Sequence, residues 1–140
     1  FEKIEQHLFA SQAYLNEYGD LKTPEQLTEH RIIRMAEDHL DQHFLLFGPE
    51  KQQKKIKINP VIMGSNLLML AELASQNCGI ALLPDTIAQD FSHSGQLVKV
   101  LPEWKAPHGI FHAVYPSRRG LLPAVRVFID YLVEQLTDRN

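Results

Sequence analysis

Residues 63–66 (MGSN) combine backbone and side-chain groups that suit the binding of an anion. They follow an apolar, strand-like run and open a segment with helical periodicity, for which Ser65 is the expected N-cap. The first N–H groups of a helix have no partner within it, and its positive dipole end attracts negative charge. The side chains of Ser65 and Asn66 add hydrogen-bond donors. We therefore expect Met63, Gly64, Ser65 and Asn66 to bind an anion such as a carboxylate; the alternative is an ordinary N-cap, with Ser65 bonded to its own helix.

Two histidine pairs have the spacing that binds a metal ion from one face of a helix, namely His39 with His43 and His108 with His112. Both pairs fall in segments predicted as strand or loop, where positions i and i+4 lie ~13 Å apart. No cysteine or carboxylate completes a tetrahedral set around them. We expect no metal and no other cofactor.

The sequence also lacks the common catalytic motifs. It has no nucleophile elbow, no P-loop and no glycine-rich dinucleotide loop. Its one cysteine, Cys78, falls at the expected carboxyl end of a helix and on the apolar face, where the dipole disfavours a thiolate. Cys78 is therefore expected to be a small core residue, and the protein is not expected to be an enzyme.

Composition and charge bound the function further. The 140 residues are 44% hydrophobic, which suits one compact body with a core. The net charge is −3, from 14 Lys and Arg against 17 Asp and Glu. Without a positive surplus to neutralise phosphates, the chain is not expected to bind DNA by itself. A single cysteine and the lack of a long apolar stretch favour the cytoplasm. The chain starts at Phe1 without Met, which hints at a fragment of something longer.

Strands and helices alternate along the chain, as in an α/β protein. The run from Lys55 to Pro84 predicts strand, helix and strand in turn, which is a βαβ unit with a buried, parallel second strand. The basic run 51–57 is expected to be a solvated turn entering a strand. Apolar runs predict strands at 4–10, 32–35, 43–47, 55–63, 80–84, 95–100 and 110–115, and caps and periodicity predict helices at 11–18, 23–30, 65–77, 85–91 and 121–136.

Several cap and turn residues fix these boundaries. Thr23 and Gln26 can form a capping box around Pro24, and Asp85 is the expected N-cap of the helix that follows it. Pro60, inside the expected strand 55–63, predicts an edge position or a bulge there.

Five segments in the same order resemble the effector-binding domain of LysR-type transcriptional regulators, in its C-terminal half. The resemblance covers nearly the whole chain and rests on 9–15 (FASQAYL), 23–30 (TPEQLTEH), 79–84 (GIALLP), 95–104 (GQLVKVLPEW) and 113–130 (AVYPSRRGLLPAVRVFID). The chain departs from the family pattern at Asn77, where glycine is usual, and at Phe44, near which the family often has tryptophan. Asparagine tolerates a left-handed conformation, so the turn at Asn77 can survive.

The resemblance implies an α/β fold like that of type 2 periplasmic binding proteins, with two lobes and two crossovers. By it, residues 14–107 are the whole of lobe two, residues 1–13 are the end of lobe one and the first crossover, and residues 108–140 are the second crossover with the last strand and helix of lobe one. It implies that residues 63–66 border the cleft between the lobes. Phe9, Ala10 and Pro84 and, on the second crossover, His112 become further candidates for lining it, although hinge packing or strand termination accounts for them equally well.

The function implied is effector sensing. A small metabolite, such as a carboxylate, binds between the lobes and shifts their angle, and a homodimer or homotetramer transmits the change to DNA through an N-terminal helix-turn-helix domain that this sequence does not contain. A solute-binding component of a transport system shares the fold and is the main alternative. An enzyme with this fold is the third, since a fold alone does not settle function.

Overall fold

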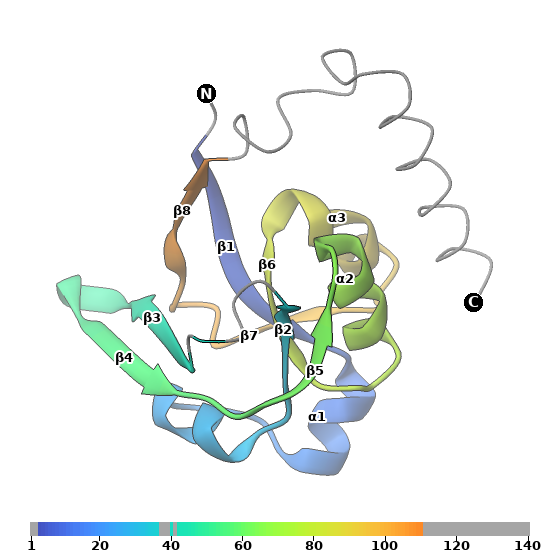
Figure 1. The fold of residues 1–140 in the computed structure, drawn as a ribbon, viewed down its shortest axis with the longest axis horizontal. Helices are drawn as coiled ribbons and strands as arrows, with labels where there is room; N and C mark the ends of the chain where they lie inside the picture. Colours follow the sequence, from blue (N-terminus) through green and yellow to red (C-terminus); the bar gives the residue numbers. More distant parts are fainter. Residues whose placement is uncertain (1–2, 37–39, 41, 111–140) are drawn as a thin grey trace.

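The protein has a mixed six-stranded sheet with two of its helices covering one face and a two-stranded hairpin on the other (Figure 1). The structure is a computed structural model and describes residues 3–36, 40 and 42–110. The elements in chain order are β1 (Lys3–Ala10), α1 (Gln12–Tyr18), η1 (Pro24–Glu29), β2 (Ile32–Met35), β3 (His43–Phe47), η3 (Pro49–Lys51), β4 (Gln53–Lys57), β5 (Pro60–Gly64), α2 (Leu67–Ser75), β6 (Ile80–Pro84), α3 (Asp85–His93), β7 (Val98–Val100) and β8 (Ala106–Ile110).

The strand order is β5-β2-β6-β1-β7, and β8 also pairs with β1. Strand β2 is parallel to both β5 and β6, while β1 is antiparallel to β6, β7 and β8. The run β5-α2-β6 is therefore the predicted βαβ unit, with β2 between its strands. The expected α/β class is confirmed.

The expected long strand over 55–63 is wrong. The chain instead forms two strands in two different sheets, with β4 paired to β3 and β5 paired to β2. Ile58 and Asn59 separate them, and the buried Ile58 side chain fills the core at this corner. Pro60 begins β5 on the sheet edge, where a residue without an N–H is tolerated, and the register with β2 shifts between Pro60 and Ile62, as an edge position with an irregularity predicts.

Helix caps follow the sequence closely at the start of the chain. Ser11 caps α1 by accepting a hydrogen bond from the Tyr14 N–H at 3.0 Å, and Gly19 ends that helix. Gln26 Oε1 accepts from the Thr23 N–H at 3.0 Å, which is one half of the expected capping box, and η1 is a short 3-10 helix.

The end of α2 depends on a close approach of two backbones. Asn77 takes the left-handed conformation (φ 66°), as its tolerance for that region allows. The Ile80 N–H then donates to the Arg31 carbonyl at 2.8 Å and starts β6 beside β2. A Cβ at Gly79 would lie 2.6 Å from the same carbonyl oxygen, so only glycine fits between these strands.

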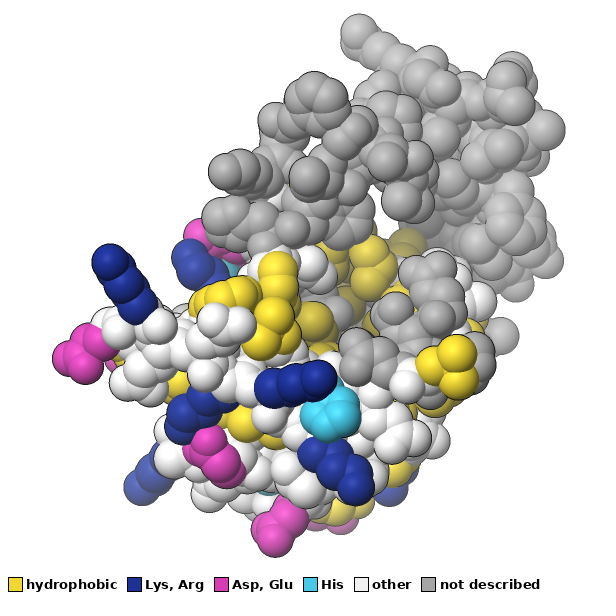
Figure 2. Space-filling view, turned by 60° about the vertical axis from the view of Figure 1, so that its left-hand side comes forward, with side chains coloured by type: hydrophobic (Ala, Val, Ile, Leu, Met, Phe, Trp, Pro, Cys, Tyr) yellow, Lys and Arg dark blue, Asp and Glu magenta, His cyan; other side chains and the backbone are white. Residues whose placement is uncertain are grey.

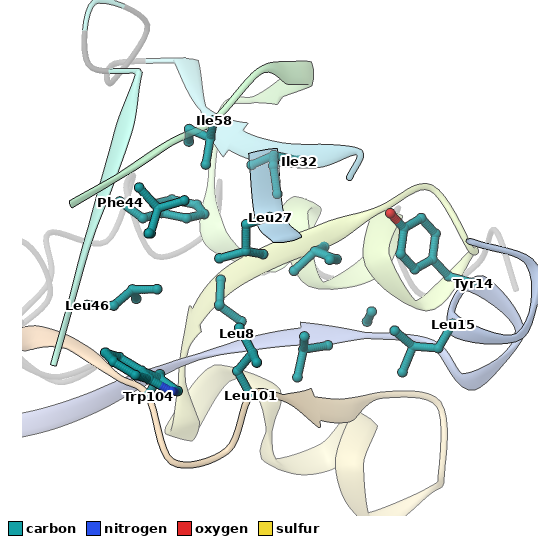
Figure 3. Close-up of a cluster of buried hydrophobic side chains, with 14 residues drawn as sticks. Leu8, Tyr14, Leu15, Leu27, Ile32, Phe44, Leu46, Ile58, Leu101 and Trp104 are labelled. Carbon is teal, nitrogen blue, oxygen red and sulfur yellow. The ribbon is translucent and has the colours of Figure 1, made fainter. Parts of the chain in front are cut away.

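Two hydrophobic clusters cover the two faces of the sheet. The first cluster lies between the sheet, the β3–β4 hairpin and η1, and Figure 3 shows Phe44, Leu46 and Trp104 in it. The second cluster lies under α2 and α3 and includes Leu70, Ala71 and Ala74 on the predicted apolar face of α2. Cys78 packs partly buried at the edge of the second cluster, as expected of a small core residue.

The β3–β4 hairpin alternates between core and solvent. Phe44 and Leu46 point into the first cluster, whereas Leu45 and Phe47 are exposed. Figure 2 shows this side of the molecule, where hydrophobic side chains lie beside Lys and Arg side chains. The basic run 51–57 forms the turn and β4, as predicted.

The chain enters and leaves this body at one place. Lys3 at the start of β1 pairs with Ile110 at the end of β8 (Figure 1). The expected helix at 121–136 and most of the expected strand at 110–115 lie outside the described residues. Within the described part of the chain, no helix has both the length and the hydropathy needed to cross a membrane.

Candidate functional site

The carboxyl ends of three parallel strands meet at one edge of the sheet. Strands β2, β5 and β6 end there at Met35, Gly64 and Pro84, and Met35 pairs directly with Gly64. In open α/β sheets the loops after the carboxyl ends of strands form the usual ligand-binding edge. The site expected at residues 63–66 lies on this edge, between the end of β5 and the start of α2.

Gly64 lets α2 pack tightly against the end of β5. A Cβ there would lie 2.6 Å from Cδ2 of Leu70, a residue that is almost fully buried in the second cluster. Any larger residue at position 64 would force the buried leucine to shift. The first turn of α2 is consequently held at the carboxyl edge.

Asn66 caps α2, so the prediction that Ser65 is the N-cap is wrong. The Asn66 Oδ1 accepts a hydrogen bond from the Met69 N–H at 2.8 Å, and the helix begins at Leu67. Asparagine caps a helix as well as serine does, and its side chain reaches the N–H three residues on. The Ser65 side chain is exposed, and its hydroxyl makes only a long contact of 3.9 Å with Met69 Sδ.

Two kinds of donor therefore lie together at this corner. The Ser65 hydroxyl is one, and the N–H groups of Leu67 and Leu68 in the first turn of α2 are the other, because the cap bond uses only the N–H of Met69. Met63, the next-to-last residue of β5, exposes 45% of its surface. The arrangement can accept an anionic group and place an apolar side chain beside it.

Pro84 lies on the same edge, beside a hydrogen-bonded pair of side chains. It is buried at the end of β6, opposite Gln6 of β1. Asp85 follows as the first residue of α3 and makes no cap bond, so its predicted role as N-cap is wrong. Its Oδ1 lies 2.7 Å from Nδ1 of His7, a buried side chain of β1.

Phe9 and Ala10 lie apart from residues 63–66, although Phe9 lines a pocket with Asp85, the residue after Pro84. They are at the carboxyl end of β1, which runs antiparallel to β6 and so ends at the opposite edge of the sheet. Phe9 is buried in the second cluster and Ala10 in the first. His112 lies outside the described residues.

Sequence reasoning missed Met35, His7 and Asp85 as residues of this edge. The short apolar strand 32–35 was expected, and its parallel pairing with β5 would have placed Met35 beside Gly64. No local signal joins His7 to Asp85, because the two residues are 78 positions apart and meet only through the β1–β6 register.

The structure describes only one histidine of each pair considered as a metal site. His43 lies on β3 and His108 on β8, while His39 and His112 lie outside the described residues.

Comparison with known proteins gives a consistent family. The family model described as "LysR substrate binding domain" matches residues 3–137. An HTH-type transcriptional regulator of Xanthomonas campestris pv. campestris (strain 8004) is 29% identical over 132 residues, which are 92% of this chain and 38% of that protein. The regulator CrgA of Neisseria meningitidis serogroup C (strain 8013) is 30% identical over 92% of this chain and 43% of its own length. The chain thus spans less than half the length of these relatives.

Solved structures show the same fold. The regulatory domain of AphB in Vibrio vulnificus superposes with a TM-score of 0.66 at 23% identity, covering 96% of this chain and 67% of that one. The CrgA regulatory domain from Neisseria meningitidis gives a TM-score of 0.63 at 24% identity over 96% of this chain and 66% of that one. These are regulatory domains of LysR-type regulators with a fold like that of periplasmic binding proteins. The chain belongs to the LysR substrate-binding domain family.

Proposed function

We propose that this chain is the effector-sensing part of a cytoplasmic LysR-type transcriptional regulator and binds a small carboxylate between two lobes, without catalysis. Residues 14–107 form lobe two in this proposal. Residues 1–13 end lobe one and form the first crossover, and residues 108–140 form the second crossover and the tail of lobe one. The candidate contacts are Met63, Gly64, Ser65 and Asn66, with Pro84 farther along the same edge.

The geometry of the Ser65 hydroxyl carries the proposal. Asn66 supplies the helix cap, which leaves the Ser65 hydroxyl with a long contact of 3.9 Å to Met69 Sδ. A hydroxyl and two helix N–H groups at the carboxyl edge can bind the two oxygens of a carboxylate. Phe9 and Ala10 are buried toward the other edge and His112 is not described, so the proposal does not depend on them.

The paired ends of β1 and β8 support a hinge at this edge. Both crossovers leave the described body side by side, at Lys3 and Ile110. A ligand that contacts both lobes would favour one angle between them, and the shift would pass through these strands. The relatives are HTH-type regulators, so in the longer protein the shift would reach DNA through a helix-turn-helix domain of a homodimer or homotetramer.

The test is a screen of small carboxylates against the longer protein that includes lobe one, read by thermal shift and then by calorimetry. Ser65→Ala should weaken binding of a hit by about 10-fold or more, as loss of a hydrogen bond to a charged group does. The matched control is Ser94→Ala, since Ser94 lies at the far end of α3. A hit whose affinity is the same for wild type and Ser65→Ala would refute this site.

Reading the coding sequence before Phe1 would distinguish a transcriptional regulator from a solute-binding component of a transporter. A helix-turn-helix domain in the same frame is expected for the regulator. A signal peptide with no such domain would instead identify a solute-binding component of a transporter. The HTH-type relatives favour the first outcome.

A further inference from the structure

Three side chains that bind metal ions meet between β1 and α3. They are Glu5 and His7 on β1 and Asp85 at the start of α3, and one ligand atom of each lies within 4.8 Å of the others. The His7 Nδ1 and Asp85 Oδ1 are 2.7 Å apart. Among the described residues, this is the one group of three or more such side chains close enough to share an ion.

Strand register brings these three side chains together. Glu5 and His7 are two residues apart on β1 and so share the sheet face that α3 covers. The pairing of Gln6 with Pro84 sets Asp85 beside them. His7 is only 5% exposed, while the Glu5 and Asp85 side chains are 46% and 34% exposed, which leaves an approach from solvent.

The ligand chemistry favours a transition metal. One imidazole nitrogen and two carboxylates suit Zn²⁺, Co²⁺ or Ni²⁺, whereas Mg²⁺ and Ca²⁺ prefer oxygen ligands throughout. Two carboxylates also balance the charge of a divalent ion. Bonds to such an ion are ~2.0–2.2 Å long, so ligands on its opposite sides lie up to ~4 Å apart. The three ligand atoms lie within 4.8 Å of one another, so binding would require the exposed Glu5 side chain to rotate toward the other two.

We propose that Glu5, His7 and Asp85 bind one divalent transition-metal ion, with water completing its coordination, and that the ion joins β1 to α3. The site is at the β1 end of the carboxyl edge. The Ser65 corner is at the β5 end, with β2 and β6 between them in the sheet. The two sites are separate, so the proposed metal site can be tested independently of the proposed effector site.

Two lysine side chains contact the carboxylates that would bind the ion, which gives a second test of the proposal. Lys105 Nζ lies 2.8 Å from Glu5 Oε1, and Lys99 Nζ lies 3.7 Å from Asp85 Oδ2. Both lysine side chains are about two-fifths exposed, and ion pairs this exposed contribute little to stability. An entering ion can therefore displace them. Removing either ammonium should strengthen metal binding.

The experiment titrates Zn²⁺, and Co²⁺ as a spectroscopic probe, into the untagged, metal-stripped 140-residue chain by calorimetry. We expect one ion to bind, and Glu5→Gln, His7→Gln and Asp85→Asn each to weaken that binding by about 10-fold or more. Lys99→Met and Lys105→Met should each tighten it. Glu5→Gln changes an exposed side chain, so this variant should keep its fold even if His7→Gln does not, and circular dichroism checks both.

The matched control is Glu103→Gln, which removes an exposed carboxylate elsewhere. This variant should bind Zn²⁺ as wild type does. Wild-type affinity in folded Glu5→Gln and Asp85→Asn would overturn the proposal, and so would an equal loss in Glu103→Gln, because the ion would then bind at other side chains of the chain.

Discussion

At the scale of single residues, the start of α2 separates two neighbouring polar side chains by role. Asn66→Ala removes the acceptor of the Met69 N–H and should lower the free energy of unfolding by about 1 kcal/mol. Ser65→Ala removes an exposed hydroxyl with one long contact and should change it by less than about 0.5 kcal/mol. Urea unfolding of the two variants measures both values. Equal losses would mean that the cap is shared or misassigned.

A partly buried side-chain pair near α1, Tyr14 and His30, should make the stability of the protein depend on pH. The Tyr14 hydroxyl accepts from the Arg31 N–H at 3.1 Å and lies 2.8 Å from His30 Nδ1, so neutral His30 can accept the tyrosine proton. Burial lowers the pKa of His30 from 6.5 and outweighs the opposing effect of Glu29. Burial also raises the pKa of Tyr14, so the phenol stays protonated and keeps its proton to donate.

The sign of the pH effect follows from that lowered pKa. The unfolded chain takes up a proton on His30 at a higher pH than the folded chain does, so proton uptake favours unfolding as the pH falls through 6.5. The contribution of neutral His30 is complete above that pH and declines below it. The difference in unfolding free energy between wild type and His30→Gln should therefore shrink as the pH is lowered, measured by urea titration at several pH values. A difference that grows toward acid would contradict the assignment.

At the scale of elements, the alternation of β3 decides which leucines matter. Leu46 is fully buried in the first cluster, whereas its neighbour Leu45 is 37% exposed on the outer face of the hairpin. Leu46→Ala should lower the free energy of unfolding by about 2–5 kcal/mol, from lost burial and the cavity left behind. Leu45→Ala is the matched control and should cost much less. Similar losses would show that the outer face is covered in solution.

The elements also show how far the sequence could lead. Apolar runs and caps located β1, α1, η1, β2, β3 and β6, because each signal is local. The split between β4 and β5 was not predictable in the same way, since Lys55 to Met63 is a continuous strand-like run. What divides it is the burial of Ile58 at a corner where the chain passes between two sheets, which is a tertiary effect.

The candidate site was predicted in part for the same reason. The turn at residues 63–66 has a local signature, and only the cap moved by one residue, from Ser65 to Asn66. The His7–Asp85 pair depends on strand register over a long separation and leaves no periodicity in the sequence. Phe9 and Ala10 matched a family segment, and their part in ligand binding stays a prediction, since β1 ends at the opposite edge of the sheet from residues 63–66.

At the scale of the whole molecule, one sheet couples the two clusters. Successive residues of its central strands point to opposite faces, so Leu8 belongs to the first cluster and Phe9 to the second, as do Ile32 and Ile33. Both clusters pack on the same strands, so unfolding of the sheet exposes the side chains of both to water. We therefore expect the chain to unfold in a single cooperative transition.

Trp104 makes this coupling measurable, because it is the one tryptophan of the chain and lies in the first cluster. Leu70→Ala opens a cavity in the second cluster, under α2 on the opposite face, and should lower the free energy of unfolding by about 2–5 kcal/mol. Trp104 fluorescence and far-UV circular dichroism should report the same loss, although Trp104 itself is unchanged. Leu40→Ala, at a leucine that is 86% exposed, should leave both transitions in place. A Trp104 transition that stays at the wild-type urea concentration in Leu70→Ala would mean that the two faces unfold separately, and an effector could then act on one face of this sheet without altering the other.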